Sequence, residues 1–378
     1  MISDLTKLLK KSSCGALCAL TAFSLVSCGG LEMRSASFET ESPETSNQAS
    51  VMMLVPAERK NELETVGEKN NSVNVRKRSP KKTVNLSISG AVKIDENIVA
   101  DASKRAGEGQ SYSFIKMFSG IYRHIADADL SMCFFKADDG AALPAEAVAV
   151  LEDVGYDVVD TTPYAGDTLA TDYGINEINS MIDEKDDIFV ADADGVTFAF
   201  LSYSNACDKD EFALNLEYAD LVSDIIVASV HWDVGETEEQ KKNAAVELAE
   251  AGIDVIIGDG DRLQNAEWIE TKDGTRSFAV YSLGNILTSS DDDNALCSGI
   301  LDLTVEVTEG SASVESALIE PTFVHYSADY NGYQTFMLGE YADEIAKTHM
   351  NPDTDPILIK NFVTDTISDE FLPENIKK

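Results

Sequence analysis

Apolar and polar positions alternate along the chain in two rhythms after Thr83. Short apolar runs of strand length are separated by longer stretches in which apolar residues recur every three or four positions. The pattern predicts helices at 112–126, 144–154, 175–182, 211–222, 236–251 and 336–348, and strands at 84–92, 129–135, 157–160, 188–191, 196–203, 225–230, 255–257, 268–271, 277–283, 299–307 and 313–323. Strands alternating with helices, followed by a strand-rich stretch, predict an α/β domain completed by a more antiparallel sheet.

The N-terminus has the pattern of an export signal. Three lysines precede an apolar run over residues 16–26, which has the length of a signal-peptide core and is too short to span a bilayer. The run ends in Leu25-Val26-Ser27-Cys28, which resembles the lipobox of bacterial lipoproteins. We therefore expect residues 1–27 to be a signal peptide and Cys28 to be lipidated. The alternative is a general secretory signal with an incidental cysteine.

The mature chain divides into three parts. Residues 28–82 are rich in Ser, Glu, Asn and Lys and lack a repeating apolar pattern, so they predict a flexible stalk. Residues 83–330 form the single main domain, and residues 331–378 a helical extension packed on it. A lipidated cysteine followed by a stalk predicts a domain held at the outer face of the bacterial cell membrane.

Charge is concentrated in the expected folded part. Residues 83–378 contain 17 basic and 58 acidic residues, a net charge of −41. A surface this negative repels phosphate backbones, so the sequence excludes nucleic acid as a partner. Cys133, Cys207 and Cys297 are an odd number at wide spacing and predict neither a disulfide framework nor a zinc motif.

Candidate chemistry lies where expected strands end in polar turns, the usual position of sites in α/β folds. The segments are Gly90 and residues 229–233, 256–262 and 281–285. The candidate cleft residues are His231, Trp232, Asp259, Asp261, Arg262, Gln264, Glu267, Gly284 and Asn285, and His231 is the one candidate for catalysis. Each also has a structural interpretation, as a strand cap or a tight turn.

The order and the amino-acid sequences of these segments resemble those of the CapA family, the bacterial capsule-synthesis or poly-γ-glutamate-synthesis proteins. The most specific part is residues 224–285, which contain SVHW, a helix, IDVIIG, the Gln264-x-x-Glu267 pair and YSLGN. The resemblance extends over about residues 83–325. It implies a metallophosphoesterase-like fold, a four-layer α/β/β/α sandwich in one main domain.

Several positions depart from the family pattern. Gly90-Ala91 stands where the family has Gly-Asp, and Cys133-Phe134-Phe135-Lys136 where it has Asn-Leu-Glu. The family's Asn–His loop appears as residues 162–165, with only residues 171–174 recognisable downstream, and its Gly-x-His-Pro-His segment as residues 258–262. A two-metal site needs converging Asp, His and Asn ligands. We therefore expect no inherited two-metal centre and no cofactor.

Two other uses of the cleft stay open. Asp259 and Asp261 with residues 291–293 could supply oxygen ligands for a single Ca²⁺ or Mg²⁺. Arg262, if it points inward, would place a fixed positive charge in the cleft and could bind an anion beside His231 and Asn285.

Three functions follow from the sequence. The one we favour is a membrane-anchored CapA-like lipoprotein, accessory to extracellular polymer synthesis or attachment of the capsule or poly-γ-glutamate type and without two-metal catalysis. Its partners would be the membrane and polymer-synthesis membrane proteins. The alternatives are an active metal-dependent phosphoesterase or polymer hydrolase with a rearranged site, and a solute- or glycan-binding lipoprotein. The net charge of −41 argues against tight binding of a polyanion.

Overall fold

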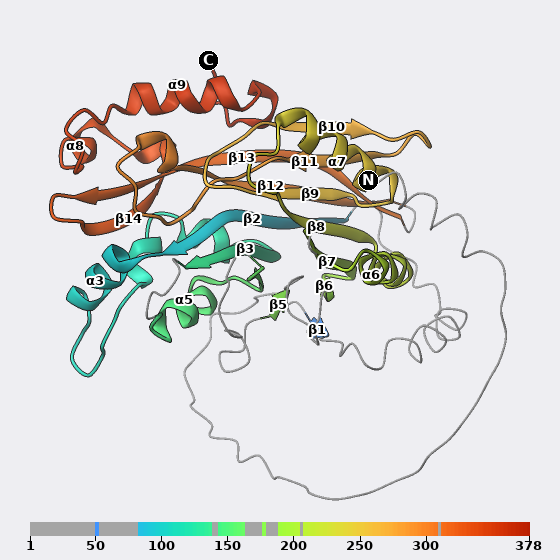
Figure 1. The fold of residues 1–378 in the computed structure, drawn as a ribbon, viewed down its shortest axis with the longest axis horizontal. Coiled ribbons are helices and arrows are strands. Elements are labelled where there is room, and N and C mark those ends of the chain that lie inside the picture. Colours follow the sequence, from blue (N-terminus) through green and yellow to red (C-terminus); the bar gives the residue numbers. More distant parts are fainter. Residues whose placement is uncertain are drawn as a thin grey trace, which may run out of the picture.

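Two seven-stranded sheets pack against each other in the computed structural model (Figure 1). The structure describes residues 50–52, 82–137, 143–162, 176–178, 188–204, 207–308 and 311–378. Sheet A contains, in spatial order, β1 (Ser50–Met52), β6 (Ile188–Ala193), β7 (Val196–Ser204), β8 (Ile225–His231), β9 (Val255–Asp259), β11 (Arg276–Val280) and β10 (Ala266–Glu270). Sheet B contains β14 (Asn331–Met337), β13 (Ser311–Ser327), β12 (Cys297–Thr308), β2 (Lys82–Ile94), β3 (Leu130–Ala137), β4 (Val158–Asp160) and β5 (Asn176–Ile178).

Each sheet has a parallel centre. In sheet A, β7, β8, β9 and β11 run parallel, and β6 and β10 pair antiparallel at either side. In sheet B, β2 to β5 run parallel, while β12, β13 and β14 extend the β2 edge antiparallel. The central strand β8 reads IIVASVH, a nearly continuous apolar run, and all of its residues except His231 are buried because both of its faces are covered.

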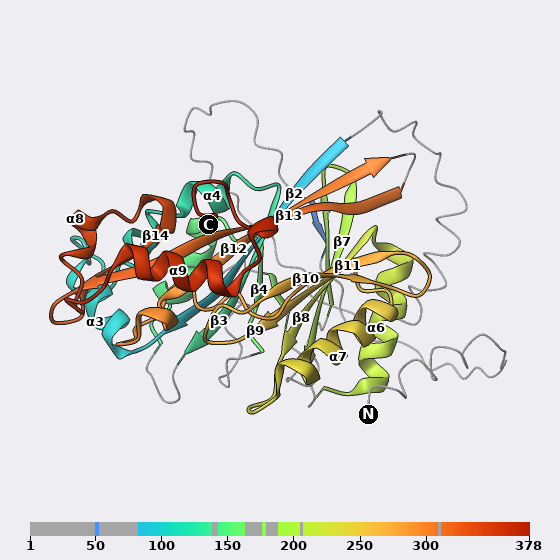
Figure 2. The same ribbon diagram turned by 90° about the horizontal axis from the view of Figure 1, so that it is seen from above.

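Helices cover the outer faces of the two sheets (Figure 2). On sheet A, α6 (Lys209–Val222) and α7 (Glu238–Glu250) bury one cluster of apolar side chains against the strands. On sheet B lie η3 (Ile115–Phe118), α4 (Tyr122–Ala126) and α5 (Glu146–Val154), with α3 (Glu96–Lys104) beside β14. The four-layer order implied by the family resemblance is confirmed.

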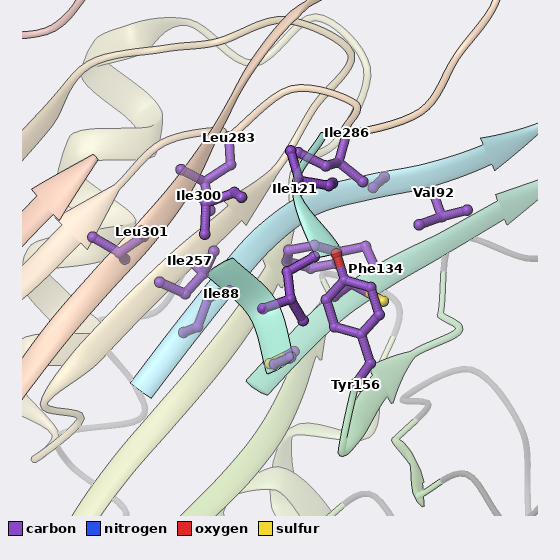
Figure 3. Packing of buried hydrophobic residues seen from close by; sticks show 14 of the residues in the cluster. Ile88, Val92, Ile121, Phe134, Tyr156, Ile257, Leu283, Ile286, Ile300 and Leu301 are labelled. Atoms are coloured by element: carbon purple, nitrogen blue, oxygen red, sulfur yellow. The ribbon is translucent and has the colours of Figure 1, made fainter. Parts of the chain in front are cut away.

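The main core lies between the sheets. Figure 3 shows Ile88 and Ile300 of sheet B gathered with Ile257 of sheet A and with Leu283. All four side chains are at most 1% exposed. Burying an aliphatic side chain of this size contributes about 1.5–3 kcal/mol, so this layer fixes how the two sheets, and the strand ends they carry, face each other.

Three expected helices differ from the structure. The helix expected at 112–126 is interrupted at Gly120, which forms a bridge to Phe336 of β14. Residues 176–178, expected in a helix, form strand β5 because they pair with β4; residues 179–182 lie outside the described residues. The sequence pattern did not reveal α3.

The helix expected at 336–348 is also wrong in its first residues. Strand β14 continues to Met337, because Tyr333 and Thr335 are buried and the strand pairs with β13. Only two short turns follow, η5 (Leu338–Glu340) and α8 (Asp343–Ala346).

The C-terminal extension lies on the main domain (Figure 1). Helix α9 (Pro356–Thr366) starts at the Asp355 cap and buries Ile359 and Val363. It is followed by η6 (Asp369–Phe371), in which Phe371 meets Phe278 of β11 edge to face at 5.3 Å between ring centroids. Among the described residues, no helix is long and apolar enough to cross a membrane.

We predict that only glycine fits at position 120, because the backbone of β14 lies directly against it. A Cβ at this position would lie 2.3 Å from the carbonyl oxygen of Thr335, a backbone atom that cannot move aside. Gly120→Ala should therefore lower the free energy of unfolding by about 1–3 kcal/mol. The control is Gly107→Ala, whose Cβ meets only Gln110 Oε1 at 3.4 Å. Equal denaturation midpoints for both variants would contradict the contact.

Candidate functional site

Strand ends from both sheets meet where the two sheets face each other. Asp160 is the last residue of β4, His231 the last of β8 and Asp259 the last of β9. Lys136 is the next-to-last residue of β3. Parallel strands deliver their carboxyl ends to one edge of a sheet, and facing sheets bring two such edges together. This is why four ionisable side chains from distant parts of the sequence become neighbours.

Asp160 is the most deeply buried charged residue of the site. Its side chain is fully buried, and its Oδ2 lies 3.0 Å from Nε2 of His231. The hydroxyl of Ser229 donates to the same oxygen, and the backbone N–H of Thr162 donates to Oδ1 at 2.8 Å. Three donors therefore hold a carboxylate that has no access to water.

The contacts continue outward from His231. Its Nδ1 lies 3.5 Å from Oδ2 of Asp259, and Lys136 Nζ lies 2.6 Å from Oδ1 of Asp259. Lys136 Nζ is also 3.6 Å from Oδ1 of Asp261, which lies 4.0 Å from Lys93 Nζ. We call these six residues the charge chain: Asp160, His231, Asp259, Lys136, Asp261 and Lys93. Their charges alternate in sign and cancel when His231 is protonated.

The charge chain keeps His231 cationic. Burial alone would lower the pKa of His231, but the charge and hydrogen bond of Asp160, and then Asp259, raise it to about 9. Burial would likewise raise the pKa of Asp259, but Lys136 and then His231 lower it. The pKa of Asp160 is lowered against its burial, first by His231. At neutral pH, His231 therefore donates to Asp160 through Nε2 and is not available as a general base.

The donor set does not fit the two-metal centre that the fold family implies. A histidine binds a metal through an unprotonated ring nitrogen, and both ring nitrogens of His231 face carboxylates. The Lys136 ammonium lies against Asp259, where a cation would have to bind. Ala91, at the family's aspartate position, is fully buried and its N–H donates to the Gly284 carbonyl at 2.9 Å.

Within the part of the chain that the structure describes, no group of three or more His, Cys, Asp and Glu side chains is arranged to hold a metal ion. The loop at 163–174, which replaces the family's Asn–His loop, lies outside the described residues.

Gly284 and Asn285 shape the turn beside the charge chain. Gly284 has φ +70°, and a Cβ there would lie 2.7 Å from the carbonyl oxygen of Cys297, so only glycine fits. Asn285 is 2% exposed, and its Nδ2 lies 3.3 Å from Oδ1 of Asp261. Both candidates therefore lie in the turn beside the charge chain, where Gly284 fixes the backbone and Asn285 contacts Asp261.

Three candidates lie apart from the charge chain, on the α7 side of sheet A. Trp232 Nε1 donates to the carbonyl of Tyr281 at 2.8 Å, and Lys241 Nζ lies 5.6 Å from the centre of the Trp232 ring. Lys241 also donates to Oε1 of Gln264 at 3.1 Å, and Glu267 accepts from the Tyr281 hydroxyl at 2.7 Å. The Lys241 contacts link α7 to Trp232 and Gln264, and the Tyr281 contacts link Trp232 and Glu267 to the segment after β11.

Arg262 does not point into the cleft, contrary to the inward orientation considered from the sequence. Its guanidinium pairs with Asp292, and its side chain is 55% exposed. The fixed positive charge of the site comes from Lys136, whose side chain is 12% exposed. The anion site expected around Arg262 is therefore not formed.

The acidic run at 291–293 does not join Asp259 and Asp261. Asp291 accepts from the Tyr330 hydroxyl at 3.2 Å, and Asp293 accepts from Asn351 Nδ2 at 3.1 Å. The two halves of the calcium or magnesium set are thus engaged in separate contacts, and the set considered from the sequence does not converge.

Asp160 and Lys136 belong to the charge chain but are not among the cleft residues predicted from the sequence. Each stands at or next to the end of an expected strand, and Lys136 was noted as a departure from the family pattern. The signal that points to both is their position: polar residues at the carboxyl ends of expected strands are site candidates, and this holds for the strands at 129–135 and 157–160 as it does for the later ones.

A cavity of about 600 Å³ lies between the C-terminal extension and residues 224–285, the part of the chain with the most specific family resemblance, which we call the family-like segment. Seven of its nine lining residues have polar side chains, and the other two are Leu263 and Ile367: Glu238, Leu263, Gln264, Asn265, Thr364, Asp365, Thr366, Ile367 and Ser368. No basic side chain and no member of the charge chain is among these lining residues.

Solved structures share limited similarity with the chain. A hypothetical protein from Thermus thermophilus matches 63% of this chain and 99% of its own, with 14% identity and a TM-score of 0.44. The calcineurin-like phosphoesterase YfkN from Bacillus subtilis matches 64% of this chain and 91% of its own (14% identity, TM-score 0.37). The 5'-nucleotidase from Candida albicans matches 76% of this chain and 59% of its own (8% identity, TM-score 0.38).

Sequence comparison gives a family match and no individual relative. No curated protein matches the chain. The family model described as bacterial capsule synthesis protein PGA_cap matches residues 178–290, which include His231, Asp259 and Asn285. The resemblance expected from the sequence is thereby confirmed, and over these residues the chain is a match to the bacterial capsule synthesis protein family.

Proposed function

We propose that this protein is a membrane-anchored, CapA-like surface lipoprotein that assists the synthesis or attachment of an extracellular polymer of the capsule type. We further propose that it does so without two-metal hydrolysis. The observation that carries this second part is the ammonium group of Lys136, which lies between Asp259 and Asp261 at the strand ends.

A divalent cation would compete with two protonated groups for the site. It would have to displace Lys136 from Asp259 and remove the proton from His231, whose pKa is about 9. Displaced Lys136 would then be a buried cation close to a doubly charged ion, which is unfavourable in a site of low water content. Asp259 has its counter-charge from Lys136 already, so metal binding gains little.

The accessory role is supported by the family match and by the charge of the domain. The match is to capsule synthesis proteins, which makes polymer export the natural context for the proposal. A net charge of −41 over residues 83–378 disfavours a tight grip on a polyanion. We therefore propose that the protein acts through polymer-synthesis proteins of the membrane, where the lipid on Cys28 would hold it.

Solute binding is the second candidate, and the cavity beside Gln264 favours it. Hydroxyl, amide and carboxylate groups line the cavity without a basic side chain among the lining residues, so it suits an uncharged, hydroxylated solute better than a polyanion.

The metal content of the purified protein tests the proposal. Protein prepared without chelator should carry Mn, Fe and Zn far below one ion per chain by mass spectrometry, and Mn²⁺ should not stimulate hydrolysis of phosphomonoesters or diesters. Ala91→Asp alone should not restore activity, because Lys136 still neutralises Asp259. Stoichiometric metal together with hydrolysis that His231→Ala abolishes would overturn the proposal.

Lys136 should be far more important for stability than an exposed lysine. Lys136→Met leaves the buried Asp259 without its closest counter-charge and should cost about 3–5 kcal/mol of unfolding free energy. Lys242→Met is the control, since Lys242 is 56% exposed and pairs with Glu267 at 2.8 Å. Its cost should be about 1 kcal/mol or less. Chemical denaturation at neutral pH measures both, and similar costs would argue against a buried pair.

The raised pKa of His231 predicts a loss of stability in alkali. The contribution of its charged form is fully present below about pH 6.5 and is lost as pH rises through about 9. Between pH 6 and pH 10 the wild type should lose on the order of 3 kcal/mol more than His231→Gln. NMR titration of the imidazole protons should place one of the four histidines near pH 9. Titration of all four below pH 7 would contradict the charge chain.

Cys28 is predicted to carry the membrane anchor. Cys28→Ala should release the protein from the membrane fraction or leave an uncleaved precursor, because the thiol is the group that would receive the lipid. Fractionation and intact mass measure the result. Normal processing and unchanged membrane association of the variant would refute lipidation.

A further inference from the structure

Two buried histidines join the C-terminal extension to sheet B. His325 lies on β13 and is 8% exposed, while His349 follows α8 in the extension and is 6% exposed. Their ring centroids are 5.3 Å apart. The next turn of chain is fastened beside them, since Met350 N–H donates to the Tyr326 carbonyl at 2.9 Å. The pair is thus a contact between the sheet and the segment that covers it.

The hydrogen bonds of His349 suit an uncharged ring. Its Nδ1 accepts from the backbone N–H of Asn351 at 3.1 Å and lies 2.9 Å from Oγ1 of Thr354. Because Nδ1 is an acceptor, the proton of the neutral ring is on Nε2, which is buried and has no partner among the described residues. A second proton on Nδ1 would face the Asn351 N–H and break that bond.

Among the described residues, the contacts of His325 include no carboxylate to balance a charge on its ring. Its Nδ1 lies 3.0 Å from the Tyr341 hydroxyl and its Nε2 lies 3.4 Å from Thr348 Oγ1, so both partners are neutral. The remaining neighbours are aromatic rings and the second histidine: Phe336, Tyr341 and His349.

One carboxylate faces the pair from another element. Asp293 of η4 (Asp293–Ala295) accepts from Thr354 Oγ1 at 3.2 Å, on the His349 side. It raises the pKa of His349, but burial has the larger effect and lowers it. Burial, with His349 adding to it, lowers the pKa of His325 to about 4. Asp291 is engaged by Tyr330 and faces the ring of Tyr326.

We propose that His325 and His349 form an acid-sensitive latch, whose protonation releases residues 338–378 of the C-terminal extension from the sheet. The docked form requires both rings to be neutral, and the released form lets them titrate normally. The latch is therefore closed above about pH 6.5 and opens as pH falls toward 4. From His325 alone, the released form should gain about 30-fold at pH 5, because each pH unit below 6.5 changes the equilibrium tenfold.

Release would uncover part of the family-like segment. Phe371 leaves Phe278, and Thr364 to Ser368 leave the cavity wall they form with Leu263 and Gln264. Acid would thus expose apolar surface on β11 and remove one wall of the cavity. This inference does not depend on the proposed accessory function or on the absence of catalysis.

Hydrogen exchange of the full chain at pH 7.5 and pH 5.0 tests the latch, with rates corrected for intrinsic exchange. In the wild type, peptides from 338–378 should lose about 30-fold or more of their protection at pH 5.0, while peptides of β2 and β12 keep theirs. His325→Phe keeps a ring of similar size without a titrating group and should reduce that loss to a few-fold.

Two further variants keep the test decisive. His349→Gln should also reduce the acid effect, and it replaces His325→Phe if that variant does not fold. The control is His124→Gln, because His124 pairs with Asp302 on another part of sheet B and should leave the effect of acid on 338–378 unchanged. Equal protection of the wild-type extension at both pH values overturns the latch. An undiminished acid effect in both His325→Phe and His349→Gln does so as well.

Discussion

The buried carboxylates of Asp160 and Asp259 set the constraint on which this site depends. Two facing sheets deliver them to the same cleft, and neither can stay charged there without a nearby cation. The family resemblance implies that metal ions supply that charge in related proteins. Here His231 and Lys136 supply it, and the alternating sequence of charges leaves the site neutral. The same fold is thus held together at its strand ends by protonated side chains.

This solution has chemical consequences. A histidine between two carboxylates is a cation at neutral pH, so it orients its neighbours and does not accept protons. Lys136 closes the space between Asp259 and Asp261, and Asn285 and Gly284 hold the adjacent loop. The candidate residues on the α7 side serve packing, and the cavity beside them is lined partly by the C-terminal extension. The charge chain and this cavity therefore lie on different parts of the domain, and residues 364–368 of the extension form one wall of the cavity.

Much of this could be predicted from the sequence because the signals were local. Period-two and period-three-to-four patterns placed the central strands and helices α6 and α7, and polar turns after strands placed His231, Asp259 and Asn285. The failures have tertiary causes. Gly120 interrupts a helical pattern because β14 approaches its backbone, and β5 is a strand only because β4 offers a partner. Arg262 and Lys136 are both basic residues at strand ends, and only the packing of the two sheets decides which one enters the cleft.

Anomalous diffraction from crystals grown with excess Mn²⁺ at neutral pH tests the central claim most directly. The account predicts Lys136 Nζ within hydrogen-bond distance of Asp259, His231 between Asp160 and Asp259, and no anomalous peak at these strand ends. A strong manganese peak bound by Asp160, His231 and Asp259, with Lys136 turned away, would contradict it.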